Sequence, residues 1–260
     1  MFDVDRFKQK LDTQWIGHDI RYFEEIESTS SHLKDLAGDE VTHGMICVAD
    51  NQTKGRGQYE RNWESAPAKN LTFTLAFRPN TGSRLHVLTL ACAWATADLV
   101  EQQTNYEAYI KWPNDVLINN RKIAGLLTET TFTGSTLDRV LVGIGLNVNQ
   151  ISFSKSLDKK ATSLCLERGS TLEREQLLAD FLHLIEYCYT LWHKNDNSLL
   201  RSINKKLVGY GRWIHISVNG DDRKGKFKLL GVDEKGQLTV INQESAVETF
   251  SYEQIELITD

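Results

Sequence analysis

The loop Gln52-Thr53-Lys54-Gly55-Arg56-Gly57-Gln58-Tyr59-Glu60-Arg61-Asn62-Trp63 stands between two apolar runs, Met45–Ala49 and Leu71–Phe77. Both runs predict β-strands, and binding loops usually sit between such elements. The two glycines let a ligand approach the backbone, and the guanidinium of Arg56 adds a cation beside the amides. No Lys-Ser or Lys-Thr follows, so this is not the phosphate loop of nucleotide hydrolases. From these residues alone, an anion site and a solvated turn are both open.

Length, composition and charge limit the classes of protein to consider. The chain has 260 residues, enough for one large domain or for a large and a small one. The net charge of −5 disfavours nucleic-acid binding as the main activity, because such proteins carry a basic surplus. The sequence has no apolar leader and no uninterrupted apolar run of about 18 residues. We therefore expect a cytoplasmic protein that does not contact membranes.

The cysteines give no sign of a metal site or of a disulfide framework. They lack a Cys-x-x-Cys pair and stand far apart, at Cys47, Cys92, Cys165 and Cys188. The first two fall in apolar segments. We therefore interpret the cysteines as reduced thiols of the core.

Local patterns predict helices and strands on both sides of the loop. Residues 2–11 fit a short helix, and Ile20–Ile26 fits a strand. Ser28-Thr29-Ser30-Ser31 follows, and its hydroxyls suit the cap of a helix that begins at His32. Capping is the simpler interpretation of Ser28 and Thr29, and a ligand contact is the alternative. Apolar residues at every third or fourth position predict an amphipathic helix over residues 86–102.

A second motif-rich stretch covers residues 110–129. Asn119-Asn120 between two alternating runs predicts a two-residue hairpin turn. The segment Lys111-Trp112-Pro113-Asn114-Asp115 breaks a strand, so Asn114 and Asp115 extend from irregular backbone. That placement suits a sugar hydroxyl or Mg²⁺, and an Asx turn is the alternative. Lys122 enters a strand beside the small residues of Ala124-Gly125, where it is either solvated or part of a site.

The second half of the chain predicts a strand, a helix and a small β-domain. Residues 140–149 form a buried-strand pattern whose Gly143 and Gly145 allow close approach of a ligand. Ser170-Thr171-Leu172-Glu173 matches a capping box, which would open a helix running through Leu191. After Leu207, short apolar runs alternate with turn residues, which predicts a β-barrel of roughly 50 residues.

Taken together, these motifs resemble the biotin protein ligases, also called biotin–[acetyl-CoA-carboxylase] ligases. The matching pieces occur in the family's order: Ser28-Thr29, Gln52 with Gly55-Arg56-Gly57 and Arg61-x-Trp63, Lys111-Trp112-Pro113-Asn114-Asp115, Arg121-Lys122-x-Ala124-Gly125, Gly143-x-Gly145-x-Asn147, and Ala161-Thr162-Ser163-Leu164. Six ordered motifs are highly specific, although each one alone is weak. The resemblance implies an α+β fold, with a mixed central β-sheet and packed helices in residues 1–206. A small SH3-like β-barrel is implied for residues 207–260, and the family's DNA-binding winged helix is not expected.

The resemblance also implies a two-step reaction. The carboxylate of biotin attacks the α-phosphate of ATP and gives biotinyl-5′-AMP and pyrophosphate, and a carrier lysine then opens the mixed anhydride. Negative charge accumulates on the phosphate in the first step, so fixed cations are needed there. By resemblance these are Arg56, Arg61 and Lys122, of which Arg56 and Lys122 are the expected catalytic residues.

The family's binding residues transfer to numbered positions of this chain. Biotin is expected to contact Ser28, Thr29, Ser30, Gln52, Gly55, Arg56, Gly57, Gln58, Lys122 and Gly125. ATP and AMP are expected to contact Arg56, Arg61, Trp63, Lys111, Asn114, Lys122 and Asn147, with Trp63 over the adenine. Asp115 is expected to hold the Mg²⁺ that accompanies ATP. The implied partners are biotin, ATP and a biotin carboxyl carrier protein, for a monomer or homodimer that binds no DNA.

One position departs from the family pattern. Gln58 stands where many members carry an arginine that is thought to hold the adenylate in the closed loop. A charged hydrogen bond is worth ~1.5–3 kcal/mol against ~0.5–1.5 for a neutral one, so we expect Lys54 or Arg61 to supply the missing charge. The nearest alternative function is a lipoate–protein ligase. A nucleic-acid-binding module built on the basic loop and an inactive paralogue that only binds biotin are further alternatives.

Overall fold

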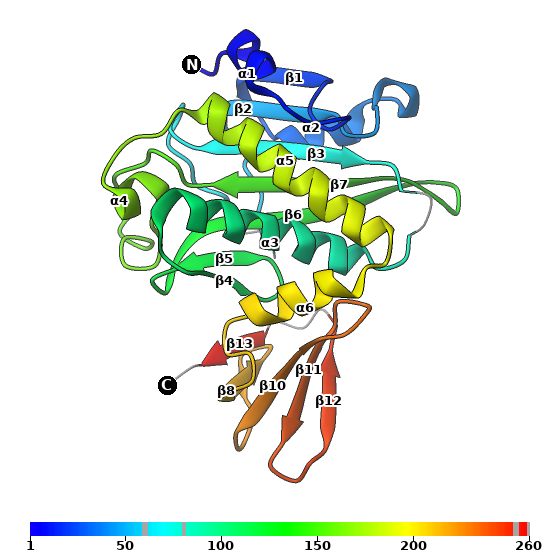
Figure 1. Ribbon diagram of the computed structural model, residues 1–260, viewed down its shortest axis with the longest axis vertical. Helices are drawn as coiled ribbons and strands as arrows, with labels where there is room; N and C mark the ends of the chain where they lie inside the picture. Colours follow the sequence, from blue (N-terminus) through cyan, green and yellow to red (C-terminus); the bar gives the residue numbers. More distant parts are fainter. Residues whose placement is uncertain (59–61, 80–81, 252–254, 259–260) are drawn as a thin grey trace.

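The computed structural model describes residues 1–58, 62–79, 82–251 and 255–258 (Figure 1). The helical elements are α1 (Val4–Lys10), α2 (Thr29–Asp35), η1 (Gly38–Glu40), α3 (Leu85–Thr104), α4 (Leu164–Arg168), α5 (Arg174–His193) and α6 (Asn197–Lys206). The strands of the large sheet are β1 (Ile20–Ile26), β2 (Ile46–Gln52), β3 (Leu71–Phe77), β4 (Ala108–Lys111), β5 (Asp115–Ile118), β6 (Arg121–Thr133) and β7 (Thr136–Leu146). The remaining strands are β8 (Trp213–Val218), β9 (Asp221–Asp222), β10 (Phe227–Val232), β11 (Leu238–Asn242), β12 (Val247–Phe250) and β13 (Ile255–Ile258).

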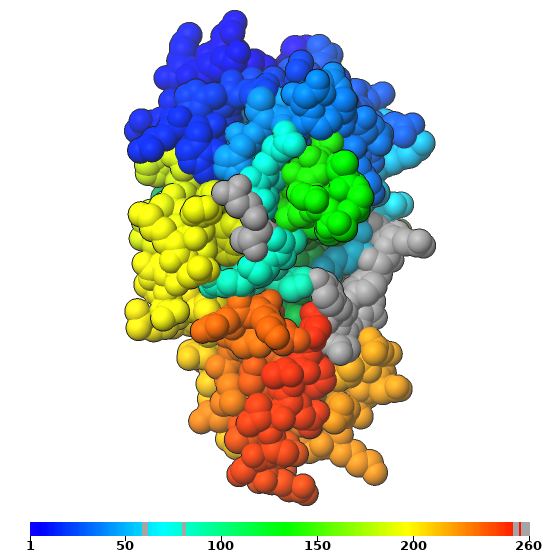
Figure 2. All heavy atoms as spheres, turned by 90° about the vertical axis from the view of Figure 1, so that its right-hand side faces the viewer, coloured from blue at the N-terminus to red at the C-terminus, as the bar shows by residue number. Residues whose placement is uncertain are grey.

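The large sheet is mixed, as the sequence predicted. Its described strands lie in the order β1-β2-β3-β7-β6-β5-β4. β1 and β2 pair in parallel, and every other neighbouring pair is antiparallel. β6 and β7 are the longest of the described strands. The tip of their hairpin extends to the right in Figure 1 and faces the viewer above the small C-terminal sheet in Figure 2. β1 and β3 have the bounds expected from their apolar patterns.

The two faces of the large sheet differ, because successive side chains of a strand point to opposite sides. On β3, Leu71, Phe73 and Leu75 join the main hydrophobic core with residues of α3 and α5. These helices cover that face (Figure 1). Thr72 and Thr74 point the other way and line a cleft. The helices therefore leave one face of the sheet open to a ligand.

The main helices form where their patterns predict them, but two details of those predictions are wrong. The helix predicted over residues 86–102 forms as α3, but the prediction that it is amphipathic is wrong. Its residues are buried on nearly all sides, because it lies between the sheet and the other helices. Helix α5 begins at Arg174 with Glu173 as its N-cap, and Glu173 makes no side-chain cap bond. The predicted capping box is therefore wrong. The carboxylate of Glu173 instead binds Arg6 at 2.8 Å and Lys10 at 3.4 Å, both from α1.

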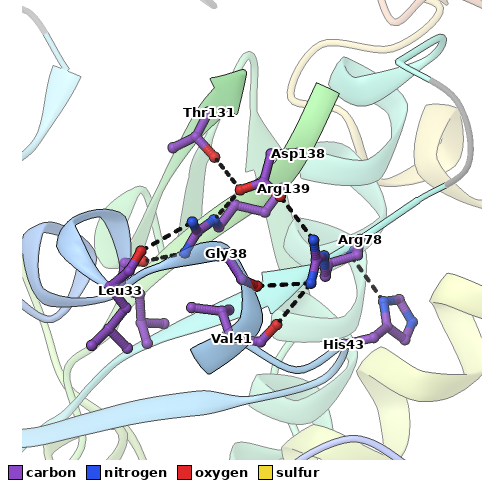
Figure 3. A network of polar contacts seen from close by, with 9 residues as sticks. Leu33, Gly38, Val41, His43, Arg78, Thr131, Asp138 and Arg139 are labelled. Atoms are coloured by element: carbon purple, nitrogen blue, oxygen red, sulfur yellow. Dashed lines mark hydrogen bonds and ion pairs between the residues drawn. The ribbon is translucent and has the colours of Figure 1, made fainter. Parts of the chain in front are cut away.

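Helix α2 is attached to the sheet by a network of charged and polar groups (Figure 3). The guanidinium of Arg139 on β7 donates to the carbonyls of Leu33 and Leu36 at 3.0 and 3.1 Å. It also pairs with Asp138 at 2.7 Å, and Asp138 binds Arg78 at 2.9 Å. This network fixes the carboxyl end of α2, so the other end of α2 is held over the open face.

The C-terminal strands form the expected small barrel-like sheet. Its described order is β12-β11-β10-β8-β13, with β9 paired to β8. The small sheet lies below the large one and contacts it through α6 (Figure 1). The indole N–H of Trp112 donates to the carbonyl of Gly236 at 3.1 Å, which joins the two parts directly. Three residues of this sheet region, Ser217, Gly220 and Ile255, also line the cleft of the large sheet.

The cysteines lie in the core as expected. Cys47, Cys92, Cys165 and Cys188 are free and buried. Burial raises the pKa of Cys47 and of Cys92 to about 12, so both stay protonated thiols. Among the described helices, none is long and apolar enough to cross a membrane.

Candidate active site

A cleft of about 640 Å³ lies on the open face of the large sheet. Its walls come from segments that are distant in sequence: the start of α2, the loop after β2, the segment between β4 and β5, residues 153–161, and the small sheet. The register of the strands arranges its floor in rows. Thr72, Gly145, Gly125 and Asp115 face one another across four neighbouring strands. Thr74, Gly143 and Leu127 form the next row.

Trp63 covers the glycines of the first row. A Cβ atom on Gly145 would lie only 2.3 Å from Cε2 of Trp63, and one on Gly125 would lie 3.1 Å from Cζ3. No side chain larger than hydrogen therefore fits at Gly145 beneath this indole. The indole nitrogen Nε1 is buried and has no hydrogen-bond partner in the described part of the chain.

Lys122 stands at one end of the first row. Its Nζ lies 2.7 Å from Oδ1 of Asp115 and 5.6 Å from the centre of the Trp63 ring, within cation–π range. The backbone of Lys122 is clamped to the following loop, since its N–H donates to the carbonyl of Lys160 at 2.7 Å and its carbonyl accepts from Thr162 at 2.9 Å. Lys122 thus lines the cleft and is paired there with Asp115.

Uncharged polar groups gather at the second row. The backbone N–H and hydroxyl of Thr29 donate to Oε1 of Gln52 at 2.8 and 3.0 Å. The hydroxyl of Thr29 also lies 2.7 Å from that of Thr74. The hydroxyl of Ser28 caps α2 by accepting from the N–H of Ser31, at 3.4 Å. Capping and cleft lining therefore coexist, because Ser28 and Thr29 also line the cleft.

Arg56 is bound to a residue that the sequence did not single out. Its guanidinium lies 2.7 Å from Oε2 of Glu129 on β6, and the hydroxyl of Ser30 donates to the same oxygen at 2.5 Å. Glu129 is seven residues from Lys122 along β6, roughly 23 Å at the rise of a strand. In this structure Arg56 therefore points toward α2 and away from Lys122. The only sequence signal for Glu129 is a charged residue inside a strand pattern.

Asn114 and Asn147 contribute buried amides to the cleft. Nδ2 of Asn114 donates to the carbonyl of Leu126 at 2.6 Å, so the side chain holds the segment after Trp112-Pro113, which has a cis peptide bond. Nδ2 of Asn147 donates to the carbonyl of Thr162 at 3.0 Å. Oδ1 of Asn147 is buried and unpartnered within the described residues. It is an acceptor that a ligand could use.

The remaining predicted residues fall into three groups. Gly57, Gln58 and Lys111 line the cleft. Gly55 is packed against the backbone of Trp63, where a Cβ would meet the carbonyl oxygen at 2.8 Å. The prediction for Arg61 falls outside the described residues.

Asp115 fits only part of a magnesium site. Nucleotide sites commonly hold Mg²⁺ through one or two carboxylates together with phosphate oxygens. Asp115 is one such carboxylate, and no cluster of three His, Cys, Asp or Glu residues suited to a metal occurs among the described residues. Because its Oδ1 is paired with Lys122, a metal ion would share the carboxylate with that lysine.

Comparisons with known proteins agree with this geometry. Residues 22–147 match the biotin/lipoate A/B protein ligase family. The chain is 32% identical to the bifunctional ligase/repressor BirA of Bacillus spizizenii, over 93% of this chain and 75% of that protein. It is 26% identical to the biotin–[acetyl-CoA-carboxylase] ligase of Mycobacterium tuberculosis, over 92% of both chains.

A solved structure shares the whole architecture. The biotin protein ligase of Aquifex aeolicus, in complex with biotin and ATP, superposes with a TM-score of 0.79 at 27% identity, over 94% of this chain and 100% of that chain. This superposition includes both the large sheet and the small sheet, since it covers nearly the whole chain. The chain therefore belongs to the biotin protein ligases of the biotin/lipoate A/B protein ligase family.

Proposed function

We propose that this chain joins biotin to ATP to form biotinyl-5′-AMP and then transfers the biotinyl group to a lysine of a biotin carboxyl carrier protein. Family membership and the likeness to a ligase solved with biotin and ATP support the reaction. The observation that carries the proposal is Lys122, a cation at the edge of a glycine floor in a cleft of about 640 Å³. We further propose that the protein acts in the cytoplasm, where ATP is available.

The two rows of the floor suggest how biotin lies. We assign the ureido ring to the second row, where Thr29 and Gln52 offer both hydrogen-bond donors and acceptors. The apolar chain would run along the indole of Trp63, which covers the glycine floor, and its carboxylate would reach Lys122. Ser28, Ser30, Gly57 and Gln58 complete the proposed biotin end, and Gly55 shapes the loop that carries them.

The nucleotide is assigned to the other end of the cleft. Trp63 offers a flat ring for stacking, and the unpartnered Oδ1 of Asn147 suits the exocyclic amino group of adenine. Lys111 and Asn114 would face the ribose and phosphates. Mg²⁺ bound with ATP would neutralise phosphate charge, with Asp115 as its protein ligand.

The first chemical step needs no covalent bond to the protein. An oxygen of the biotin carboxylate attacks the α-phosphorus, and the bond to the bridging oxygen of the β-phosphate breaks, so pyrophosphate leaves with that electron pair. Lys122 stabilises the negative charge that grows on the α-phosphate oxygens, as a fixed cation in a partly desolvated site. We assign the guanidinium of Arg56 a role in positioning the loop, because it is paired with Glu129.

In the second step the neutral amine of the carrier lysine attacks the acyl carbon, and AMP leaves. Lys122 then faces the departing phosphate, where its charge again favours the leaving group. Water would compete with the amine for the mixed anhydride. A closed loop over the intermediate would therefore limit its hydrolysis.

An avidin blot of a carrier protein tests the proposal. We expect the carrier to be labelled when incubated with this chain, biotin, ATP and Mg²⁺, and to remain unlabelled when ATP is omitted. Lipoate in place of biotin is the control for the nearest alternative. Lipoyl transfer without biotinyl transfer would overturn the assignment.

A further inference from the structure

Glu129 lies at a junction of three residues near the biotin end of the cleft. Its Oε2 accepts from the hydroxyl of Ser30 at 2.5 Å and pairs with the guanidinium of Arg56 at 2.7 Å. The ammonium of Lys34 lies 3.6 Å from its other oxygen, Oε1. The side chain of Glu129 is 17% exposed and that of Arg56 is 41% exposed, so solvent screens their contact only partly. No predicted role in the reaction accounts for this carboxylate.

The register of β6 sets the distance between Glu129 and the reacting atoms. Gly125, Leu127 and Glu129 alternate along the strand and share the open face. Glu129 is four residues beyond Gly125, about 13 Å along the strand, and farther still from Lys122. It cannot touch the α-phosphate, so any effect on the reaction must act through the residues that it holds.

Those residues belong to two separate segments. Ser30 is in the first turn of α2, and Arg56 is in the loop after β2, where it lines the cleft. Accepting both donors on one oxygen, Glu129 fastens the loop and the helix to the same point of the sheet. A charged hydrogen bond of this kind is about twice as strong as a neutral one, and partial burial preserves it.

A second ion pair holds the same loop and can be compared with the pair of Arg56 and Glu129. Lys54 pairs with Glu27 at 2.8 Å, but their side chains are 70% and 69% exposed. Exposed pairs contribute little because water and salt screen them. The two pairs have similar lengths and hold the same loop, and they differ in burial.

We propose that Glu129 is a positioning residue that latches the Gly55–Gly57 loop through Arg56 and so sets how long the acyl-adenylate is retained. This inference rests on the proposed function, because it concerns the lifetime of that reaction's intermediate. The latch leaves the chemistry at Lys122 unchanged and slows the opening of the loop. In this chain it takes added importance, because position 58 carries the neutral Gln58 in the same loop.

The test compares Glu129→Gln with Glu27→Gln, which removes the same charge from the exposed pair. Preformed biotinyl-5′-AMP is chased with excess biotin, and its dissociation rate is measured for each variant. We expect Glu129→Gln to release the intermediate at least tenfold faster, and Glu27→Gln to stay within twofold of the wild type. The maximal rate of pyrophosphate exchange should change less than threefold in either variant, whereas a general loss of structure would reduce it.

Arg56→Gln opens the same latch from the other side and covers the case in which Glu129→Gln folds poorly. If the latch exists, Arg56→Gln and the double variant release the intermediate as fast as Glu129→Gln alone. Equal dissociation rates for Glu129→Gln, Arg56→Gln and the wild type would overturn the proposal, and so would an equal acceleration by Glu27→Gln. A wild-type protein that forms no adenylate would instead contradict the proposed function.

Discussion

Two groups of charged side chains on the large sheet differ in how fully their hydrogen-bonding capacity is used. In the Asp138 network, formed by Arg78, Asp138 and Arg139, the Arg139 side chain is only 6% exposed. Its guanidinium binds one carboxylate and two carbonyls. Burial pushes the pKa of Asp138 upward, but hydrogen bonds and charges from Arg139 and Arg78 outweigh burial and lower it.

In the cleft, by contrast, several polar groups have few partners or none within the described residues. Lys122 is 36% exposed and pairs with one carboxylate. Within the described residues, Nε1 of Trp63 and Oδ1 of Asn147 are buried without partners. A buried polar group without a partner costs roughly 1–3 kcal/mol, so it is unusual in a folded protein. The comparison indicates that the Asp138 network serves stability and that the cleft keeps its polar groups for a ligand.

The largest expected effect comes from removing the charge of the cleft. Lys122→Ala should lower the rate of pyrophosphate exchange by ~10²–10³-fold, the scale for losing one stabilising contact to a developing charge. Urea unfolding should change little, because the Lys122 side chain is partly exposed. Lys155→Ala is the matched control, since Lys155 is in the loop beside the cleft but does not line it. Near-normal exchange in a folded Lys122→Ala protein would return this lysine to a solvated role.

Breaking the Asp138 network should lower stability and leave activity nearly unchanged. Asp138→Asn leaves two arginines without their carboxylate, and we expect a loss of about 3 kcal/mol in the free energy of unfolding by urea. The exchange rate of the folded fraction should stay near that of the wild type. Glu248→Gln in the small sheet, whose partner Arg223 is exposed, should cost under about 1 kcal/mol. Equal losses in the two variants would remove the distinction between the regions.

A third change adds a charge to the cleft. Gln58→Arg should slow the release of biotinyl-5′-AMP by less than tenfold, that is by under about 1.4 kcal/mol. Lys54, one of the two expected substitutes, is paired with Glu27 and does not line the cleft, and Arg61 lies outside the described residues. We still expect a small effect, because the loop is fastened through Arg56 and Glu129. The dissociation rate of the preformed intermediate is the measurement. A hundredfold slowing would mean that the natural loop has no substitute for the missing cation.

The smallest effect concerns pH and the histidine beside the Asp138 network. Burial, and then the charge of His193, lowers the pKa of His43, whose Nδ1 accepts from the backbone N–H of Arg78 at 2.9 Å. The unfolded chain then binds more protons below about pH 6.5, so this contribution to stability is complete above that pH and declines as pH falls. The midpoint of urea unfolding should fall less between pH 7.5 and 5.5 in His43→Gln than in the wild type. An unchanged or larger fall would contradict this assignment.

Local patterns predicted an element well where the residues within that element are enough to form it. β1 and β3 follow from apolar runs, and Asn119-Asn120 adopts positive φ at both positions, as a two-residue hairpin requires. The cap of α2 by Ser28 was also predicted. The capping box before α5 failed because Arg6 and Lys10 of α1 attract the carboxylate of Glu173.

The ordered motifs of the sequence determined the fold class through the resemblance to a known family. The sequence by itself also determined the loop with its glycines and the candidate lysine, because such motifs and turn residues are local properties of the chain. Only the tertiary structure decided which partners these residues have. Arg56 meets Glu129 across 73 positions of sequence, and the buried pair of Asp50 and Arg174 spans 124. Such contacts depend on the register of strands and the packing of helices, which no local pattern encodes.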